Sequence, residues 1–139
     1  MQMTGILGQP PTRLLSALIR GDRGAALDAI HAGDDVNARD PRPVIGDNTT
    51  VLHHAAGTGD SVVVRELIQH GAEVNIQTDN GATPLWFACN GDHFDAAKEL
   101  LENGADATIP NRDGYLPRDR IRASSVQLAR ILDDFSKPE

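Results

Sequence analysis

The chain has 139 residues, a formal net charge of −7, and 40% hydrophobic but only 4% aromatic residues. This length fits one domain with its own core, built from aliphatic side chains that favour packed helices over an aromatic-rich sheet sandwich. The acidic balance disfavours nucleic-acid binding, because phosphate contacts require Lys and Arg, and the single cysteine, Cys89, excludes an internal disulfide and a thiolate zinc site.

The first residues, MQMTGILGQPPTRLL, lack the basic region and the long apolar segment of a signal peptide. The longest aliphatic run, Val62-Val63-Val64, is far too short to span a membrane. We therefore expect a cytoplasmic protein without membrane contact.

The chain repeats itself with a period of 33 residues. The segment TVLHHAA at 50–56 recurs as TPLWFAC at 83–89, and ELIQHGAEVNI at 66–76 recurs as ELLENGADATI at 99–109. Upstream, 18–37 aligns with 56–75 at an offset of 38, so five extra residues lie in the segment 38–48. A period of this length indicates stacked repeats, none of which can bury its apolar face alone.

The repeat frame predicts four units between two short ends. In chain order they are a flexible N-terminus at 1–8, a first unit and N-terminal cap at 9–37, a second unit at 38–75 with an extended loop at 39–48, a third unit at 76–108, a fourth unit and C-terminal cap at 109–136, and a tail at 137–139.

Each unit has the signals of two helices joined by a turn. In the third, Thr83 is expected to cap the first helix and Pro84 to occupy its first turn. Gly104, like Gly71 one period earlier, stands where a left-handed residue ends the second helix. In the fourth unit the predicted second helix carries an apolar stripe of Val126, Leu128, Ile131, Leu132 and Phe135.

The segment NGATPLWFACNGDHFDAAKELLENGAD at 80–106 resembles the ankyrin repeat, whose hallmark is Thr-Pro-Leu-His-x-Ala followed by Leu-Leu-x-x-Gly-Ala-Asp-Val-Asn. The resemblance covers roughly 12–135 and implies an all-α solenoid of helix-turn-helix units with projecting hairpin-like loops. It also implies that the His53 imidazole, with the Thr50 hydroxyl, links neighbouring loops by hydrogen bonds. Trp86 replaces this histidine in the third unit.

The adjacent histidines His53 and His54 raise the question of a metal or catalytic site. Neighbouring residues on a helix point about 100° apart, and no strong ligand stands four residues later, so we expect no metal and no cofactor. His31, His70 and His93 lie in other units. No nucleophile stands in a distinctive motif and no glycine-rich phosphate loop is present, so we predict that the protein is not an enzyme.

The resemblance places partner contacts at the loop tips and on the concave face of the first helices. His54 is expected on that face, and Arg42, Val44 and Ile45 on the extended loop. The full set of candidate contacts comprises Arg42, Val44, Ile45, His54, Thr58, Gln77, Asp79, Asn80, Trp86, Phe87, Asn90, Arg112, Asp113 and Tyr115.

Two functions follow as hypotheses. The first is a non-catalytic monomer that binds one protein, as an inhibitor, antidote (immunity protein) or adaptor. Residues 59–106 hold nine acids and two bases, which favours a basic partner. The alternative is a secreted effector, or a structural subunit that acts through self-association.

Overall fold

The computed structural model describes residues 11–42 and 47–136, in which the elements are helices and no strand is present. Val44 and Ile45 of the extended loop lie outside these residues. The helices are α2 (Arg13–Arg20), α3 (Arg23–His31), α4 (Val51–Thr58), α5 (Ser61–Gln69), α6 (Pro84–Asn90), α7 (Phe94–Glu102), the 3-10 helix η1 (Pro117–Arg120) and α8 (Val126–Ser136).

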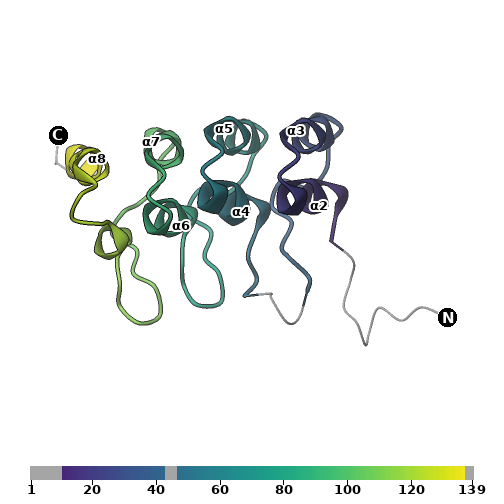
Figure 1. Cartoon of the computed structure of the whole chain (residues 1–139). Helices are drawn as coiled ribbons and strands as arrows, with labels where there is room; N and C mark the ends of the chain where they lie inside the picture. Colours follow the sequence, from purple (N-terminus) through teal and green to yellow (C-terminus); the bar gives the residue numbers. More distant parts are fainter. Residues whose placement is uncertain (1–10, 43–46, 137–139) are drawn as a thin grey trace.

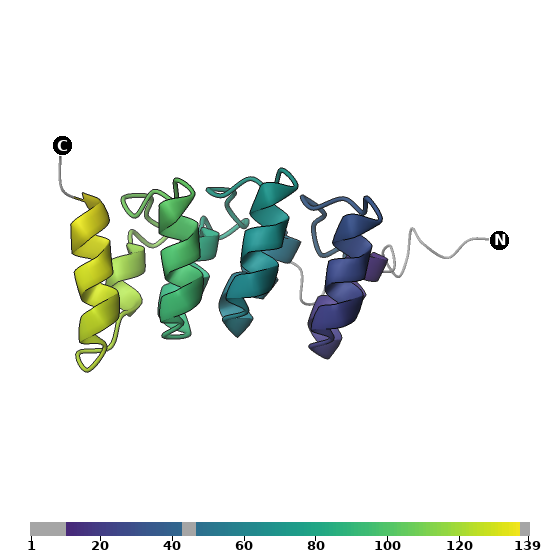
Figure 2. The same ribbon diagram turned by 90° about the horizontal axis from the view of Figure 1, so that it is seen from above.

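These helices form a row of helix pairs in two layers (Figure 1). The inner layer holds α2, α4, α6 and η1, next to the projecting loops, and the outer layer holds α3, α5, α7 and α8. Within each layer neighbouring helices pack side by side, as Figure 2 shows for the outer one. The predicted all-α solenoid of stacked helix pairs is confirmed.

The inner helices begin where the repeat predicts. Thr12, Thr50 and Thr83 each accept a hydrogen bond from the backbone N–H three residues later, which satisfies one free donor of the helix start. Pro84 occupies the first turn of α6, where no backbone donor is needed. The repeated threonine therefore sets the start of three inner helices.

The turns between paired helices require one residue in the left-handed region. Gly59 fills this position after α4, with φ of 81°. After α6 the equivalent residue is Asp92, with φ of 60°, while the preceding Gly91 is right-handed. Aspartate tolerates the left-handed region better than most side chains, so the turn survives the loss of glycine.

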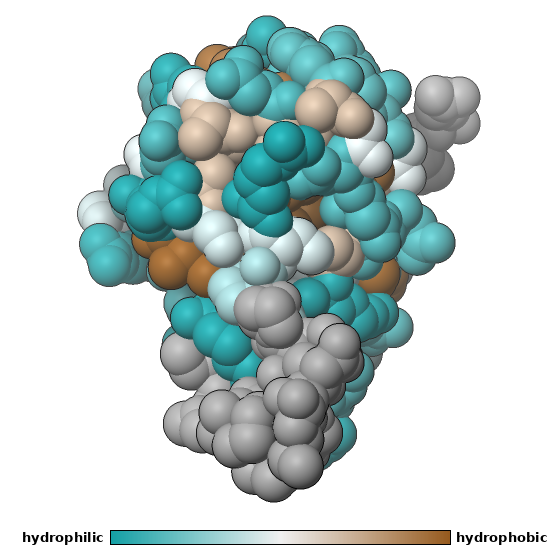
Figure 3. Space-filling view, turned by 90° about the vertical axis from the view of Figure 1, so that its right-hand side faces the viewer, coloured by the Kyte–Doolittle hydropathy of each residue, from teal (hydrophilic) through white to brown (hydrophobic). Residues whose placement is uncertain are grey.

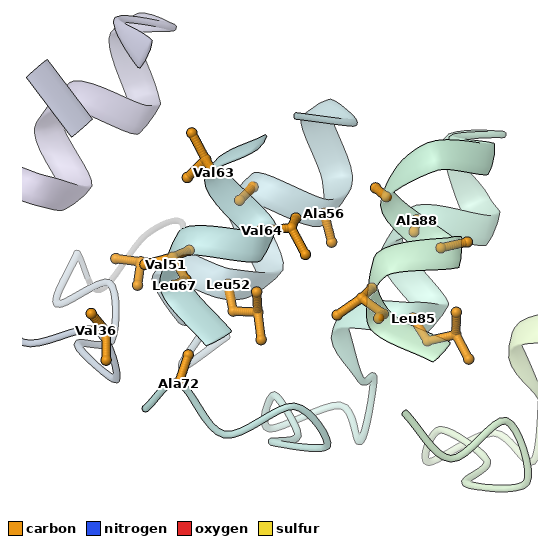
Figure 4. Close-up of a cluster of buried hydrophobic side chains, with 14 of the residues drawn as sticks. Val36, Val51, Leu52, Ala56, Val63, Val64, Leu67, Ala72, Leu85 and Ala88 are labelled. Carbon is orange, nitrogen blue, oxygen red and sulfur yellow. The ribbon is translucent and has the colours of Figure 1, made fainter. Parts of the chain in front are cut away.

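The core runs along the row between the two layers and between adjacent pairs. Figure 4 shows Leu52 of α4 and Leu85 of α6 among the side chains that fill the space between the second and third pairs. Both leucines are at most 1% exposed, and no Phe, Tyr or Trp of the chain is fully buried. The core is therefore a close packing of Leu, Val, Ile and Ala, with the imidazole of His53 as its one ring.

Asparagines link consecutive units at the ends of the outer helices. Asn37 donates to the carbonyl of Gly71 (3.2 Å) and accepts from the backbone N–H of Glu73 (2.8 Å). Asn75 makes the same pair of bonds one unit later, to Gly104 (3.1 Å) and from Asp106 (2.8 Å). Gly71 and Gly104 have φ of 99° and 95°, so each combines a left-handed turn with an acceptor for the previous unit.

The two ends of the row differ from its middle. In α8 only Leu128, Ile131 and Leu132 of the predicted stripe are buried, whereas Val126 and Phe135 are 59% and 47% exposed. The predicted stripe was too wide, because α8 has a neighbouring outer helix, α7, on one side only. At the other end, hydrophilic residues cover most of the visible described surface, with small apolar areas between them (Figure 3).

None of the described helices is long and apolar enough to cross a membrane.

Candidate protein-binding surface

Each long loop between units closes like a hairpin. Backbone hydrogen bonds join the two arms of each loop. They run from Asp40 to Thr49 (2.7 Å) and from Val51 to Ala38 (3.1 Å) in the first loop, from Thr78 to Ala82 (2.9 Å) in the second and from Asn111 to Tyr115 (2.8 Å) in the third. In the last two, Gly81 and Gly114 take left-handed φ values of 83° and 85° at the turn. The second and third loops therefore project as defined turns below the inner helices (Figure 1).

Hydrogen bonds also join each tip to the next. The N–H of Asp79 donates to the carbonyl of Asp47 (2.8 Å), and the Asn48 amide donates to the Asp79 carboxylate (3.1 Å). On the other side, Arg112 donates from its guanidinium to the Asp79 carbonyl and from its N–H to the Asn80 carbonyl, both at 2.7 Å. We call residues 47–48, 77–81 and 111–115 the tip ridge.

The tip ridge contains several of the candidate contact residues. Gln77, Asp79, Arg112 and Asp113 are exposed and Asn80 is half-buried. Tyr115 is 50% exposed, although its backbone N–H is held by the side chain of Asn111 (2.9 Å). A phenol ring on an anchored backbone loses little conformational freedom when it is covered, which suits a binding contact.

Arg42 and His54 lie together around a buried carboxylate. Asp40 is 4% exposed, and the Arg42 guanidinium donates to both of its oxygens, with 2.8 Å from Nε to Oδ1. These hydrogen bonds lower the pKa of Asp40 to about 2, against the opposing effect of burial. The ion pair holds the base of the extended loop.

His54 is less accessible than the sequence indicated. Its side chain is 24% exposed and its Nε2 lies 3.5 Å from Oδ2 of Asp40, too far for a strong hydrogen bond. Burial lowers the pKa of His54, and the Asp40 carboxylate opposes this shift. Contact with a partner would use the exposed edge of the ring, and that role remains a prediction.

His53 lies inside the stack and connects two units. Its Nδ1 accepts from the backbone N–H of Thr50 (3.0 Å) and lies 2.8 Å from the Thr50 hydroxyl oxygen. Its Nε2 is 3.0 Å from the carbonyl of Ala82, in the loop of the next unit. Because the ring is fully buried, desolvation lowers the pKa of His53 to about 4, and the imidazole is neutral at physiological pH.

The third unit presents aromatic side chains where the second presents histidines. The Arg120 guanidinium lies 5.3 Å from the Trp86 ring centroid, a cation–π distance, and its Nε donates to Asn90 (3.3 Å). Phe87 packs against His53 with ring centroids 5.1 Å apart. Trp86 and Phe87 are half-buried, so both contribute to the packing between units, while Asn90 is exposed, as is Thr58 on α4.

Two contacts that hold the candidate surface were missed at the sequence level. His93 bonds through Nε2 to the carbonyl of Gly57 in the previous unit (3.0 Å), and a Cβ on Gly59 would lie 2.4 Å from the His93 ring. Asp40 looked like an ordinary loop acid. The repeat frame could have found His93, because it follows the turn residue Asp92, whereas nothing local marks Asp40 as buried.

Neither Cys89 nor the serines beside α8 form a nucleophile–base pair in the described part of the chain. Burial raises the pKa of the Cys89 thiol to about 12, so this side chain is not a thiolate nucleophile at neutral pH. A hollow of about 370 Å³ beside α8 contains Asp92, Ser124 and Ser125. Ser125 donates to Asp92, but no histidine or lysine lines the hollow to act as a base.

A family model for ankyrin repeats, in three copies, matches residues 14–111. The chain belongs to the ankyrin-repeat family. The match ends at the start of the last unit, where Leu116 replaces the capping threonine and η1 replaces a full inner helix. Ankyrin repeats mediate protein–protein interaction, so the exposed parts of the tip ridge and inner helices are the surfaces to consider first.

Several relatives align over most of this chain. Mouse protein phosphatase 1 regulatory subunit 27 is 39% identical over 85 residues, which cover 61% of this chain and 55% of the relative. The Caenorhabditis elegans ankyrin repeat and KH domain-containing protein mask-1 is 42% identical over 109 residues, covering 78% of this chain and 4% of the relative. Schizosaccharomyces pombe ankyrin repeat-containing protein P1E11.10 is 30% identical over 122 residues, which cover 86% of this chain and 55% of the relative. The alignments thus span about half or less of each relative.

Proposed function

We propose that this chain binds one protein partner through the tip ridge and the adjoining inner-helix face, and acts by covering a functional surface of that partner. The observation that carries the proposal is the network of hydrogen bonds between successive tips, centred on Asp79 and Arg112. Loops that are ordered before binding lose less entropy on association. The bound chain would serve as an inhibitor, antidote or adaptor, and the regulatory subunit among its relatives supports a regulatory role.

The charge distribution supports a basic partner. Several acids of the segment 59–106 lie on or directly before the outer helices, where Asp60 pairs with Arg23 (2.8 Å) and Glu99 with Arg65 (2.7 Å). The segment still holds nine acids against two bases. Its field would speed the approach of a basic surface, so the association rate should fall as salt is added.

Capture from the source cell followed by titration of the purified partner tests the proposal. Tyr115→Ala removes the most exposed ring of the tip ridge and should weaken binding at least about tenfold, as an interface aromatic does. Phe135→Ala is the matched control, because Phe135 is similarly exposed at 47% but lies on α8, in the outer layer. Equal binding by the wild type, Tyr115→Ala and Asp79→Ala would contradict the assignment of this surface.

The same titration addresses His54 and the extended loop. His54→Ala should leave the fold intact and change affinity only if the inner-helix face is covered. Val44→Ala and Ile45→Ala, which lie outside the described residues, extend the test to the rest of the segment 39–48. We also propose that the free chain is a monomer; a mass that rises with concentration in light scattering would favour the self-association alternative.

A further inference from the structure

Three side chains with metal-binding atoms meet where the first and second units join in the outer layer. His31 is the last residue of α3, Glu66 lies in α5, and His70 follows the end of α5. One ligand atom from each residue lies within 4.8 Å of the other two. The distance of His31 from His70 in sequence made this meeting unexpected, and only the stacking of α3 on α5 produces it.

The separations fit a small transition-metal ion. Nε2 of His31 lies 3.1 Å from Oε2 of Glu66, and Nδ1 of His70 lies 4.0 Å from the same oxygen. Zinc binds nitrogen and oxygen ligands at about 2.0–2.2 Å, which places the ligand atoms of a tetrahedral site about 3.3 Å apart. The His31–Glu66 pair meets this spacing already, and a small movement of the exposed His70 ring meets the rest.

The backbone keeps the side chains of His31, Glu66 and His70 close to one another. Glu66 and His70 are four residues apart at the end of one helix, which puts them on the same face. Without an ion, Nδ1 of His70 donates to the carbonyl oxygen of Glu66 (2.8 Å), which keeps the ring beside the carboxylate until an ion replaces this hydrogen bond. The two imidazole rings have centroids 5.7 Å apart. The cluster is therefore largely arranged before any ion binds.

We propose that His31, Glu66 and His70 bind one divalent transition-metal ion, for which Zn²⁺ is the probe. Two imidazoles and one carboxylate suit zinc and its neighbours, and disfavour Mg²⁺ and Ca²⁺, which prefer oxygen ligands. Both histidines bind as neutral rings with a bare ligand nitrogen. The ring proton therefore moves from Nε2 to Nδ1 in His31 and from Nδ1 to Nε2 in His70, whose bond to the Glu66 carbonyl is given up. Three protein ligands leave a fourth position for water.

The bound ion would clamp two repeat units together. His31 belongs to the first unit, and Glu66 and His70 belong to the second. At the opposite end of the same helix seam, Arg23 of α3 pairs with Asp60 ahead of α5 (2.8 Å). With the ion, both ends of the α3–α5 seam carry a cross-link, and the terminal first unit is held more firmly.

Titration calorimetry of the untagged chain with ZnCl₂, slightly above neutral pH, tests the site. One ion should bind per chain, and Glu66→Gln should weaken binding more than about tenfold. Substituting residues that only hydrogen-bond to metal ligands already lowers metal affinity about 10–100-fold. The double variant His31→Ala/His70→Ala should lose binding. Glu99→Gln is the control, because Glu99 is a similar outer-helix carboxylate that pairs with Arg65 and has no histidine partner among the described residues.

Thermal unfolding and hydrogen exchange give a second measurement. Zn²⁺ should raise the Tm of the wild type and of Glu99→Gln, but not of the double variant, and should slow exchange of the α3 amides. Circular dichroism checks that the exposed substitutions keep the fold. Absence of binding in the wild type, or wild-type affinity in Glu66→Gln or in the double variant, would overturn the site. Binding without slower exchange in α3 would overturn the clamp.

Discussion

The helices α4 and α6 begin with the same pattern, Thr-x-Leu followed by His53 in one and Trp86 in the other, yet they join the next unit differently. Both are capped by their threonine. His53 then donates across the seam to the carbonyl of Ala82 (3.0 Å). Trp86 makes no hydrogen bond from Nε1 within the described chain, and instead its ring lies beneath Arg120 of η1.

This difference shows that one backbone design accepts two kinds of contact between units. A buried imidazole gives a directional bond that sets the position of the next loop, whereas a ring and a guanidinium tolerate a range of positions. The carbonyl equivalent to Ala82 is that of Tyr115, which accepts from Asn111 and receives no imidazole bond. The loop that carries Tyr115 therefore receives no hydrogen bond from the side chain of Trp86 on α6, whereas the loop that carries Ala82 receives one from His53 on α4.

The largest expected effect comes from removing the His53 and Trp86 rings, one in each helix. His53→Ala leaves a cavity and an unpaired backbone N–H on Thr50, and removes the bond to the Ala82 carbonyl, so it should lower the free energy of unfolding by about 4 kcal/mol. Trp86→Ala removes a half-buried ring without leaving a broken hydrogen bond, and should cost about 2 kcal/mol. Urea unfolding measures both values. Equal costs would show that the imidazole bonds add little beyond packing.

Acidification should weaken the contact that His53 of α4 makes with the next unit, but not the corresponding contact of Trp86 on α6. The pKa of His53 is about 4 in the folded chain and about 6.5 when unfolded, so from pH 6.5 down to 4 only the unfolded state takes up this proton. Stability is therefore lost as the pH falls through this window, by on the order of 3 kcal/mol in total, and His53 contributes no further loss below pH 4.

Urea unfolding at a series of pH values measures this effect. A His53→Asn variant should show a flatter dependence between pH 6.5 and 4, while Trp86→Ala should follow the wild type. The pKa of Asp40, lowered to about 2 by Arg42, predicts a separate loss below about pH 4 that both variants retain. A variant without His53 that still shows the full loss would contradict the assignment.

The smallest expected effects come from the two capping threonines, Thr50 and Thr83, which are the most closely matched pair of residues. Thr83→Ala removes one cap bond and should cost about 1 kcal/mol of unfolding free energy. Thr50→Ala removes the same bond and also the hydroxyl contact with His53 Nδ1, so it should cost about 2 kcal/mol. Equal values for the two threonines, measured by thermal unfolding, would mean that the Thr50–His53 pair acts only as a cap.

Much of the fold could be predicted because its signals are local and repeated. Thr83, Pro84 and Gly104 act within a few residues of their own positions, and a period of 33 shows that the same units recur. The candidate contacts could be placed on loops or on inner helices for the same reason. The prediction that Val126 and Phe135 belong to the buried stripe of α8 was wrong, because their exposure depends on what lies beside the last unit.

By itself, the sequence determined the family and where most helices begin, because these follow from spacing and short-range chemistry. Only the tertiary structure decided which side chains of different units meet. The burial of Asp40 behind Arg42, the bond from His53 to Ala82 and the cluster of His31, Glu66 and His70 all join residues of different elements. The tip ridge has the same origin: its exposed side chains are local features, but the hydrogen bonds that align the tips exist only once the units are stacked.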